Sequence, residues 1–138
     1  TVLHVAAFCS HAALVKELIK AGADVNMRVC ADAQRDVTNP SVIVISNNTA
    51  LHLAASSRCH TPTIMELIKG GADVNIANSC GVTPLHIAAE VGQEAAVLAL
   101  MHAGADVNAV MRNGHTPLSL AMQEKHEKIV ELLKHFGA

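Results

Sequence analysis

The chain has 138 residues, 51% of them hydrophobic, which is enough for one domain with a buried core. Ten basic and twelve acidic residues give a formal charge of -2, which disfavours a nucleic-acid partner because polyphosphates bind excess positive charge. No apolar run reaches the roughly 18 residues of a membrane span, and the four cysteines form no C-x-x-C pair. We therefore expect no membrane insertion, free thiols, and a location in the cytoplasm or nucleus.

The first predicted unit runs from Thr1 to the string Gly22-Ala23-Asp24-Val25-Asn26. The same five-residue string occurs at residues 71–75 and 104–108, and these two copies start 33 residues apart. A threonine at position 1, 49, 83 or 116 precedes the glycine at 22, 71, 104 or 137 by 21 or 22 residues. Self-similarity at a fixed period of this length indicates a repeat architecture.

Between the first and second units the chain is longer than elsewhere. From the glycine of the string to the next threonine there are 27 residues here and 12 in the two later intervals, a difference of 15. We place the inserted loop at about residues 29–46. Turn-forming residues followed by Val42-Ile43-Val44-Ile45 predict an extended hairpin, and a tolerated loop without a binding role is an equal alternative.

The third unit predicts a pair of helices most clearly. Thr83 is a favourable N-cap, Pro84 suits the first helical position, and the apolar spacing that follows predicts about two helical turns. Residues 94–102 predict a second helix, and Gly104 suits the left-handed residue that ends it. The segments between units carry turn residues, as expected for hairpin-like loops.

The second and fourth units depart from this pattern. The second has Ala50 in place of proline, and Thr61-Pro62 predicts an N-cap and first position that restart its second helix after a longer turn. The second helix of the fourth unit carries Glu127, Lys128, Glu131 and Lys134. This polarity is expected of a terminal unit with one uncovered face.

The string Thr83-Pro84-Leu85-His86-Ile87-Ala88-Ala89, the two short helices, the Gly-Ala-Asp-Val-Asn string and the 33-residue period together resemble the ankyrin repeat family. The resemblance covers the chain outside residues 29–46. It implies an all-α solenoid of stacked helix-turn-helix units with β-hairpin-like loops. We expect one domain, 1–138, with repeats at about 1–28, 44–77, 78–110 and 111–138, the first lacking its N-terminal hairpin.

Histidines and aspartates recur unit by unit, which favours an architectural role over catalysis. The resemblance implies that His4, His52 and His86 form hydrogen bonds that tie adjacent loops together. The nine histidines show no zinc-ligand spacing, and no nucleophile or phosphate-binding motif is present. We therefore predict no enzymatic activity, no cofactor and no metal site.

Three asparagines close the Asp-Val-Asn strings, each eight residues after a leucine: Asn26, Asn75 and Asn108. This pattern resembles ankyrin sites that an asparaginyl hydroxylase modifies, so all three are candidate hydroxylation sites. We favour the alternative that each asparagine stabilises its loop through hydrogen bonds from its side chain to the backbone.

Ankyrin-type proteins bind other proteins through their hairpin tips and the exposed side of their first helices. The resemblance therefore implies a concave binding surface, on which the positions that differ between units are free to specialise. These positions are Phe8, Ile45, Ser46, Asn48, Ser56, Ser57, Ser79, Cys80, Val82, Glu90, Val91, Arg112, Asn113, His115, Gln123 and Glu124. We expect Phe8, Arg112 and His115 to be the anchors, since aromatic and arginine groups dominate interface energies.

These expectations lead to a protein-interaction scaffold or regulatory binding module that is a monomer by itself. Two alternatives stay open at this point. The chain is the ankyrin segment of a larger enzyme, channel or signalling protein, or it is a stoichiometric inhibitor of a kinase-like enzyme.

Overall fold

The computed structural model describes residues 1–29, 47–57 and 61–138, and these residues form eight α-helices. In chain order they are α1 (Val2–Phe8), α2 (Ala12–Lys20), α3 (Ala50–Ser56), α4 (Thr61–Lys69), α5 (Pro84–Val91), α6 (Glu94–His102), α7 (Pro117–Gln123) and α8 (Glu127–His135). Consecutive helices form pairs, which we call unit one (α1 and α2) to unit four (α7 and α8). The expected all-α solenoid is confirmed.

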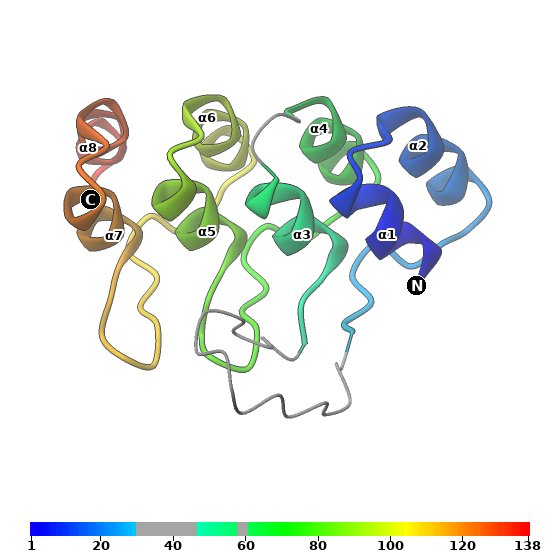
Figure 1. Cartoon of the computed structure of the whole chain (residues 1–138), viewed down its shortest axis with the longest axis horizontal. Helices are drawn as coiled ribbons and strands as arrows, with labels where there is room; N and C mark the ends of the chain where they lie inside the picture. The colour runs from blue at the N-terminus through cyan, green and yellow to red at the C-terminus, as the bar shows by residue number, and fades with distance from the viewer. Residues whose placement is uncertain (30–46, 58–60) are drawn as a thin grey trace.

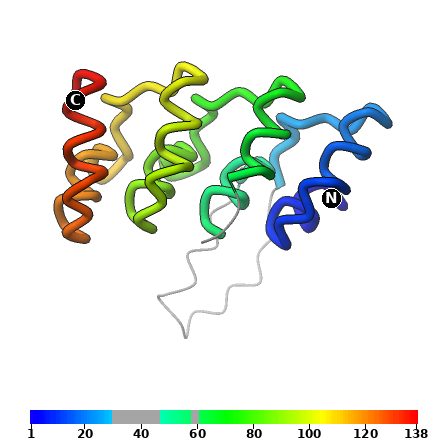
Figure 2. Tube along the Cα trace, turned by 90° about the horizontal axis from the view of Figure 1, so that it is seen from above, coloured from blue at the N-terminus to red at the C-terminus, as the bar shows by residue number. Residues whose placement is uncertain are grey.

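The four units follow one another in a single row. In Figure 1 the first helices α1, α3, α5 and α7 lie side by side, with α2, α4, α6 and α8 above them and the loops below. Figure 2 shows the same order from above, with each pair placed against the next. First helices therefore form the layer between the loops and the second helices.

Threonine caps start the first helices, as the sequence predicts. Thr49, Thr83 and Thr116 form capping boxes, in which threonine and the third helical residue satisfy each other's backbone N–H groups. Pro84 and Pro117 stand in the first turn, where the missing N–H has no helical partner to lose. Helix α4 begins at Thr61, so this threonine is helical and the start lies one residue earlier than predicted.

Glycines end the second helices in the left-handed conformation. Gly22, Gly71 and Gly104 have φ angles of 90°, 91° and 89°. The alanine N–H after each glycine bonds back to a leucine carbonyl of the last helical turn at 3.0 Å. Only glycine adopts this backbone without strain, so the repeated string terminates each helix at the same place.

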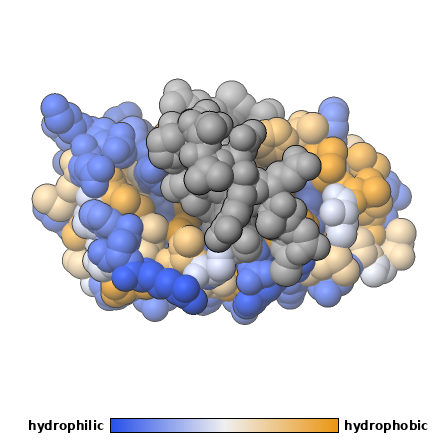
Figure 3. Space-filling view, turned by 60° about the horizontal axis from the view of Figure 1, so that its bottom comes forward, coloured by the Kyte–Doolittle hydropathy of each residue, from blue (hydrophilic) through white to orange (hydrophobic). Residues whose placement is uncertain are grey.

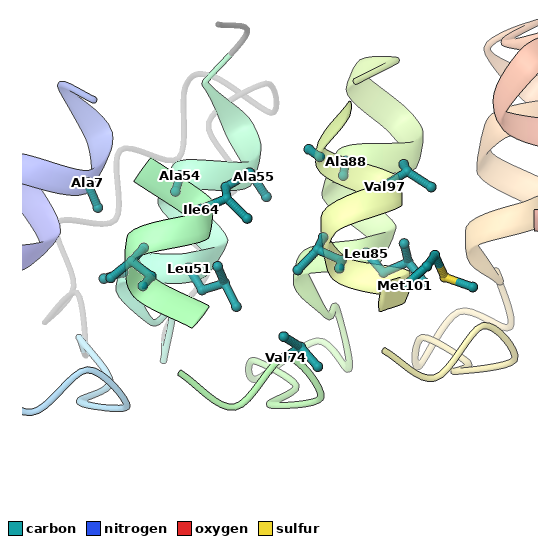
Figure 4. Close-up of a cluster of buried hydrophobic side chains, with 14 of the residues drawn as sticks. Ala7, Leu51, Ala54, Ala55, Ile64, Val74, Leu85, Ala88, Val97 and Met101 are labelled. Atoms are coloured by element: carbon teal, nitrogen blue, oxygen red, sulfur yellow. The ribbon is translucent and has the colours of Figure 1, made fainter. Parts of the chain in front are cut away.

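The core is shared between units. Large aliphatic side chains of the second and third units are completely buried, among them Leu51, Ile64 and Leu85 where the two helical layers meet (Figure 4). Leu67 and Leu100 are also completely buried. Buried alanine pairs in the first helices, such as Ala54-Ala55 and Ala88-Ala89, let neighbouring helices approach closely. No unit could bury this surface alone, so stacking stabilises each one.

The loops are hairpin-like, as expected. The amide N–H groups of Asn78 and Met111 donate to Val82 O and His115 O, both at 2.9 Å, and close the loops that precede α5 and α7. At the base of the insertion, Val29 and Asn48 form an isolated antiparallel bridge. The predicted hairpin of the insertion lies in residues 30–46, outside the described residues.

Candidate protein-interaction surface

Histidines tie each loop to the first helix of the unit before it. The Nε2 atoms of His4, His52 and His86 lie 3.2, 2.9 and 3.3 Å from the carbonyl oxygens of Asn48, Val82 and His115, each in the following loop. All three rings are buried. The hydrogen bonds that the sequence resemblance implied for these histidines are present, and they run from the first helix of one unit to the loop that follows that unit.

The hydrogen bonds of His52 assign its neutral tautomer. The backbone N–H of Thr49 donates to Nδ1 at 3.2 Å, and the Thr49 hydroxyl lies 2.9 Å from the same nitrogen. Because Nδ1 accepts, Nε2 carries the proton and donates it to Val82 O. Burial lowers the pKa of His52 to about 4, and it also lowers the pKa of His4 and His86. These rings are structural and neutral.

Asparagines form a second row of ties on the outer loops. Asn26 donates from Nδ2 to Gly71 O at 3.2 Å and accepts from the Asp73 N–H at 2.8 Å. Asn75 makes the same pair of bonds to Gly104 O and to the Asp106 N–H, at 3.1 and 2.7 Å. Two of the three candidate hydroxylation sites therefore use their amides to join neighbouring units.

Most of the predicted binding positions are accessible. Phe8, Ser56, Cys80, Glu90, Arg112, Asn113, Gln123 and Glu124 are exposed, and Asn48, Ser57, Ser79, Val91 and His115 are half-buried. Adjacent hairpin tips are tied to each other, since the Arg112 N–H donates to Cys80 O at 3.0 Å. Ile45 and Ser46 lie outside the described residues. The loops and first helices thus expose predicted positions in every unit.

Val82 is a correction to this set. Its side chain is buried, and its carbonyl accepts hydrogen bonds from His52 Nε2 and from the Asn78 N–H, both at 2.9 Å. The position differs between units in sequence, but it closes the loop and packs inward. Val82 is therefore unavailable to a partner.

An apolar groove lies where α1, α3 and the base of the insertion meet. It has a volume of about 370 Å³ and is lined by Thr1, His4, Val5, Phe8, Val29, Asn48 and Leu53. Val5 and Phe8 are 63% and 60% exposed, which is unusual for side chains of this size. The equivalents of Phe8 in the later units are Ser56, Glu90 and Gln123, so within the described residues only unit one has an apolar side chain at this position.

Apolar exposure is concentrated at this end of the molecule. Five of the eight large exposed hydrophobic residues in the described chain are Val2, Val5, Phe8, Leu14 and Met27, all in unit one or its loop. Figure 3 shows apolar side chains gathered at the right-hand end of the view, where Figure 1 places unit one. The large apolar side chains that stay exposed in the described residues therefore lie mainly in unit one.

Sequence reasoning identified Phe8 but missed Val5, Val29 and Leu53. Val5 lies three residues before Phe8 and therefore on the same helical face, so its spacing from Phe8 could have predicted its exposure. The sequence did not distinguish Val5 from a core residue, because the matching positions of the later units are also apolar: Leu53, Ile87 and Leu120. Val29 enters the groove through its pairing with Asn48, which only the folded chain shows.

The described residues offer no cluster of three or more potential metal ligands. Among them, too, no helix is long and apolar enough to cross a bilayer. The described residues form a solenoid of stacked α-helical units. Its accessible features include an apolar groove and a row of loop tips.

Comparison with known families identifies the repeat. The family model described as ankyrin repeats in three copies matches residues 3–111 and, in a second match, residues 51–138. The two matches cover almost the entire sequence, so the chain belongs to the ankyrin repeat family. Ankyrin repeats in general mediate protein–protein interaction. A search of curated proteins finds no match.

Proposed function

We propose that this chain is a non-catalytic protein-interaction module, a scaffold or regulatory subunit, that holds its partner along the loops and first helices. The observation that carries the proposal is the apolar groove lined by Val5 and Phe8. Ser57 bonds Phe8 O at 3.0 Å beside it, and the first helices of units two to four expose polar residues at the position of Phe8. An apolar anchor beside polar positions is the composition of a protein interface with a desolvated centre and a polar rim.

The groove favours a partner that inserts one apolar side chain. Its walls are aliphatic and aromatic, while Thr1 and Asn48 provide polar groups at its edge. A leucine or an aromatic residue on a helix or extended segment is the matching chemistry. The rest of the partner would lie along Glu90, Arg112, Gln123 and Glu124. The charges of Glu90, Arg112 and Glu124 would tune specificity and association rate more than affinity.

The test begins with a partner captured from cell extract, purified, and titrated against the chain and its variants. Phe8→Ser is expected to weaken binding by about tenfold or more, since anchors of this kind typically contribute above 1 kcal/mol. Arg112→Ala with His115→Ala is expected to weaken it less. Phe8 is exposed, so the variant keeps the fold, which circular dichroism verifies.

Met65→Ser is the matched control. Met65 is also a large exposed side chain, but it lies on α4 and outside the groove, so its substitution should change affinity by less than about twofold. Equal losses for Phe8→Ser and Met65→Ser, or no loss for either, would reject the groove as the binding site.

The proposal also covers the cellular compartment of the chain and the hydroxylation of its asparagines. Cys9 and Cys80 are exposed free thiols, which suits a reducing compartment, the cytoplasm or nucleus. We propose a monomer without a nucleic-acid ligand. Asn26, Asn75 and Asn108 are proposed hydroxylation sites, with the structural role favoured for the first two. Mass spectrometry of the chain isolated from cells tests each asparagine.

A further inference from the structure

Unit one exposes the face that every later unit buries against its predecessor. In unit one Val2 is 64% and Leu14 is 44% exposed. The residues equivalent to Val2 are Ala50, Pro84 and Pro117, and those equivalent to Leu14 are Thr63, Ala96 and Ile129; all six are buried. Leu18 is half-buried, whereas its equivalents Leu67, Leu100 and Leu133 are fully buried. We call Val2, His11, Leu14 and Leu18 the leading face of unit one.

A polar tie at the start of the second helix marks the same face. In unit three, the α6 N-cap Gln93 donates from Nε2 to Ala55 O of unit two at 3.0 Å. In unit four, the α8 N-cap His126 has its Nε2 3.0 Å from Glu90 O of unit three. His11 is the N-cap of α2 and its ring is exposed. The His11 ring is therefore accessible for the same kind of hydrogen bond, to a backbone carbonyl at the end of the first helix of a preceding unit.

The opposite end of the row is built differently. On the trailing face of unit four, Met122 is 57% exposed where the other three units have the buried alanines Ala7, Ala55 and Ala89. Lys134 replaces the apolar Ile19, Ile68 and Met101 of those units. Ile19 packs so closely on unit two that a Cβ placed on Gly70 would lie 2.7 Å from its Cδ1. Bulk and charge at these positions oppose further stacking.

We propose that the leading face of unit one is the stacking surface for one further ankyrin-type helix pair. Its occupant presents an alanine at the position of Ala55, an aliphatic residue at that of Ile19, and open carbonyls at the end of its first helix. The occupant is a helix pair of the ankyrin type, because each of the three stacked contacts in the described residues joins two such pairs. A second copy stacked head to tail would bring Met122 and Lys134 against Leu14, which is not complementary.

The test extends the full chain by one unit. A copy of residues 83–115 is joined directly to Thr1, so that Thr1 follows a copied His115 as Thr116 does in the chain. Amide hydrogen exchange in α1 and α2 is expected to slow by about tenfold or more, because a covered face opens less often. Leu14→Asp should abolish this gain in the extended chain and change little in the unextended chain, where Leu14 is exposed.

A control extends the other end. A copy of residues 106–138 joined after Ala138 should leave exchange in α7 and α8 nearly unchanged. Unchanged exchange in α1 and α2 of the N-terminally extended chain, or equal gains at both ends, would overturn the proposal. So would a dimer of the unextended chain in sedimentation analysis that Leu14→Asp dissociates, since a second copy would then be the occupant. Phe8 lies outside the leading face, so the groove and the stacking surface can fail independently.

Discussion

Two rows of hydrogen bonds join neighbouring units, one made by histidines and one by asparagines. The rings of the histidine row are buried, and His52 has no exposed surface at all. The asparagine row lies at the surface, where Asn26 and Asn75 each make two bonds to the next unit. Both rows perform the same task, which is to hold one unit in register with the next.

Burial makes the two rows different in energy. A carbonyl that loses its partner at the surface is hydrated, whereas a carbonyl that loses its partner in the interior stays unpaired at a cost of about 1–3 kcal/mol. The histidine row therefore carries more of the stability of the stack, and its rings are held in a single protonation state. The following predictions test this difference.

His52→Ala should produce the largest loss of stability, about 4 kcal/mol. The variant removes the bond to Val82 O, leaves the Thr49 N–H without its acceptor, and opens a cavity in the core. Urea unfolding followed by circular dichroism measures the change. Ser119→Ala is the control, because Ser119 holds the same position in unit four, where its hydroxyl bonds Thr116 in the capping box and lies 3.4 Å from His115 Nδ1, without a bond to another unit. Its loss should be about 1 kcal/mol, and equal losses would contradict the argument.

Acid should cause the second-largest loss of stability, through protonation of the histidine row. The pKa of His52 is about 4 in the folded chain against 6.5 when unfolded, so between these pH values the unfolded chain binds more protons. Stability is therefore complete above pH 6.5 and falls as the pH drops towards 4, by up to about 3 kcal/mol from this ring. The lowered pKa of His4 and His86 acts in the same direction.

Unfolding free energies measured from pH 7 to pH 4.5 test the acid effect. His52→Gln should make the dependence shallower, because the titrating ring is gone. A flat profile for the parent chain, or an unaltered slope in the variant, would show that the buried ring does not control this transition.

Thr63→Val should raise stability by about 1 kcal/mol. Thr63 is fully buried in α4, and its hydroxyl has no hydrogen-bond partner within the described residues. A methyl group of similar shape removes the unpaired polar atom. The same substitution at Thr49, whose buried hydroxyl bonds His52, should lower stability by a similar amount. Thermal unfolding measures the change in stability of both variants. If both substitutions raised stability, or both lowered it, the roles assigned to the two hydroxyls would be refuted.

Asn75→Ala should have a small effect, a loss of about 1 kcal/mol. Its two lost partners, Gly104 O and the Asp106 N–H, are exposed and become hydrated. Asn108 closes the same string, but within the described residues its side chain makes no such bonds to unit four, so Asn108→Ala should cost less than about 0.5 kcal/mol. Chemical denaturation of the two variants side by side measures the difference. Indistinguishable losses would show that the bonds between units contribute nothing.

The local elements could be predicted from the sequence because their determinants act within one helical turn. Thr83 and Pro84 start a helix through their own backbone geometry, and Gly104 ends one because a left-handed residue is required there. Their recurrence established the repeat and hence the solenoid. His52 occupies a position at which units one, two and three each have a histidine, and this recurrence predicted that the ring has an architectural role. The hydrogen bond from His52 to Val82 O in the following loop confirms that role.

The accessible surface was decided only by the tertiary structure, since burial depends on what a neighbouring unit covers. Val5, Leu53 and Ile87 are alike in sequence, yet Val5 is exposed and forms the groove with Phe8. Val82 varies like a surface residue, yet the loop turns it inward. Sequence by itself determined the fold of each unit through contacts within that unit. The stacking of unit upon unit determined which apolar side chains remain open to a partner, because the same residue is core beside one neighbour and surface without it.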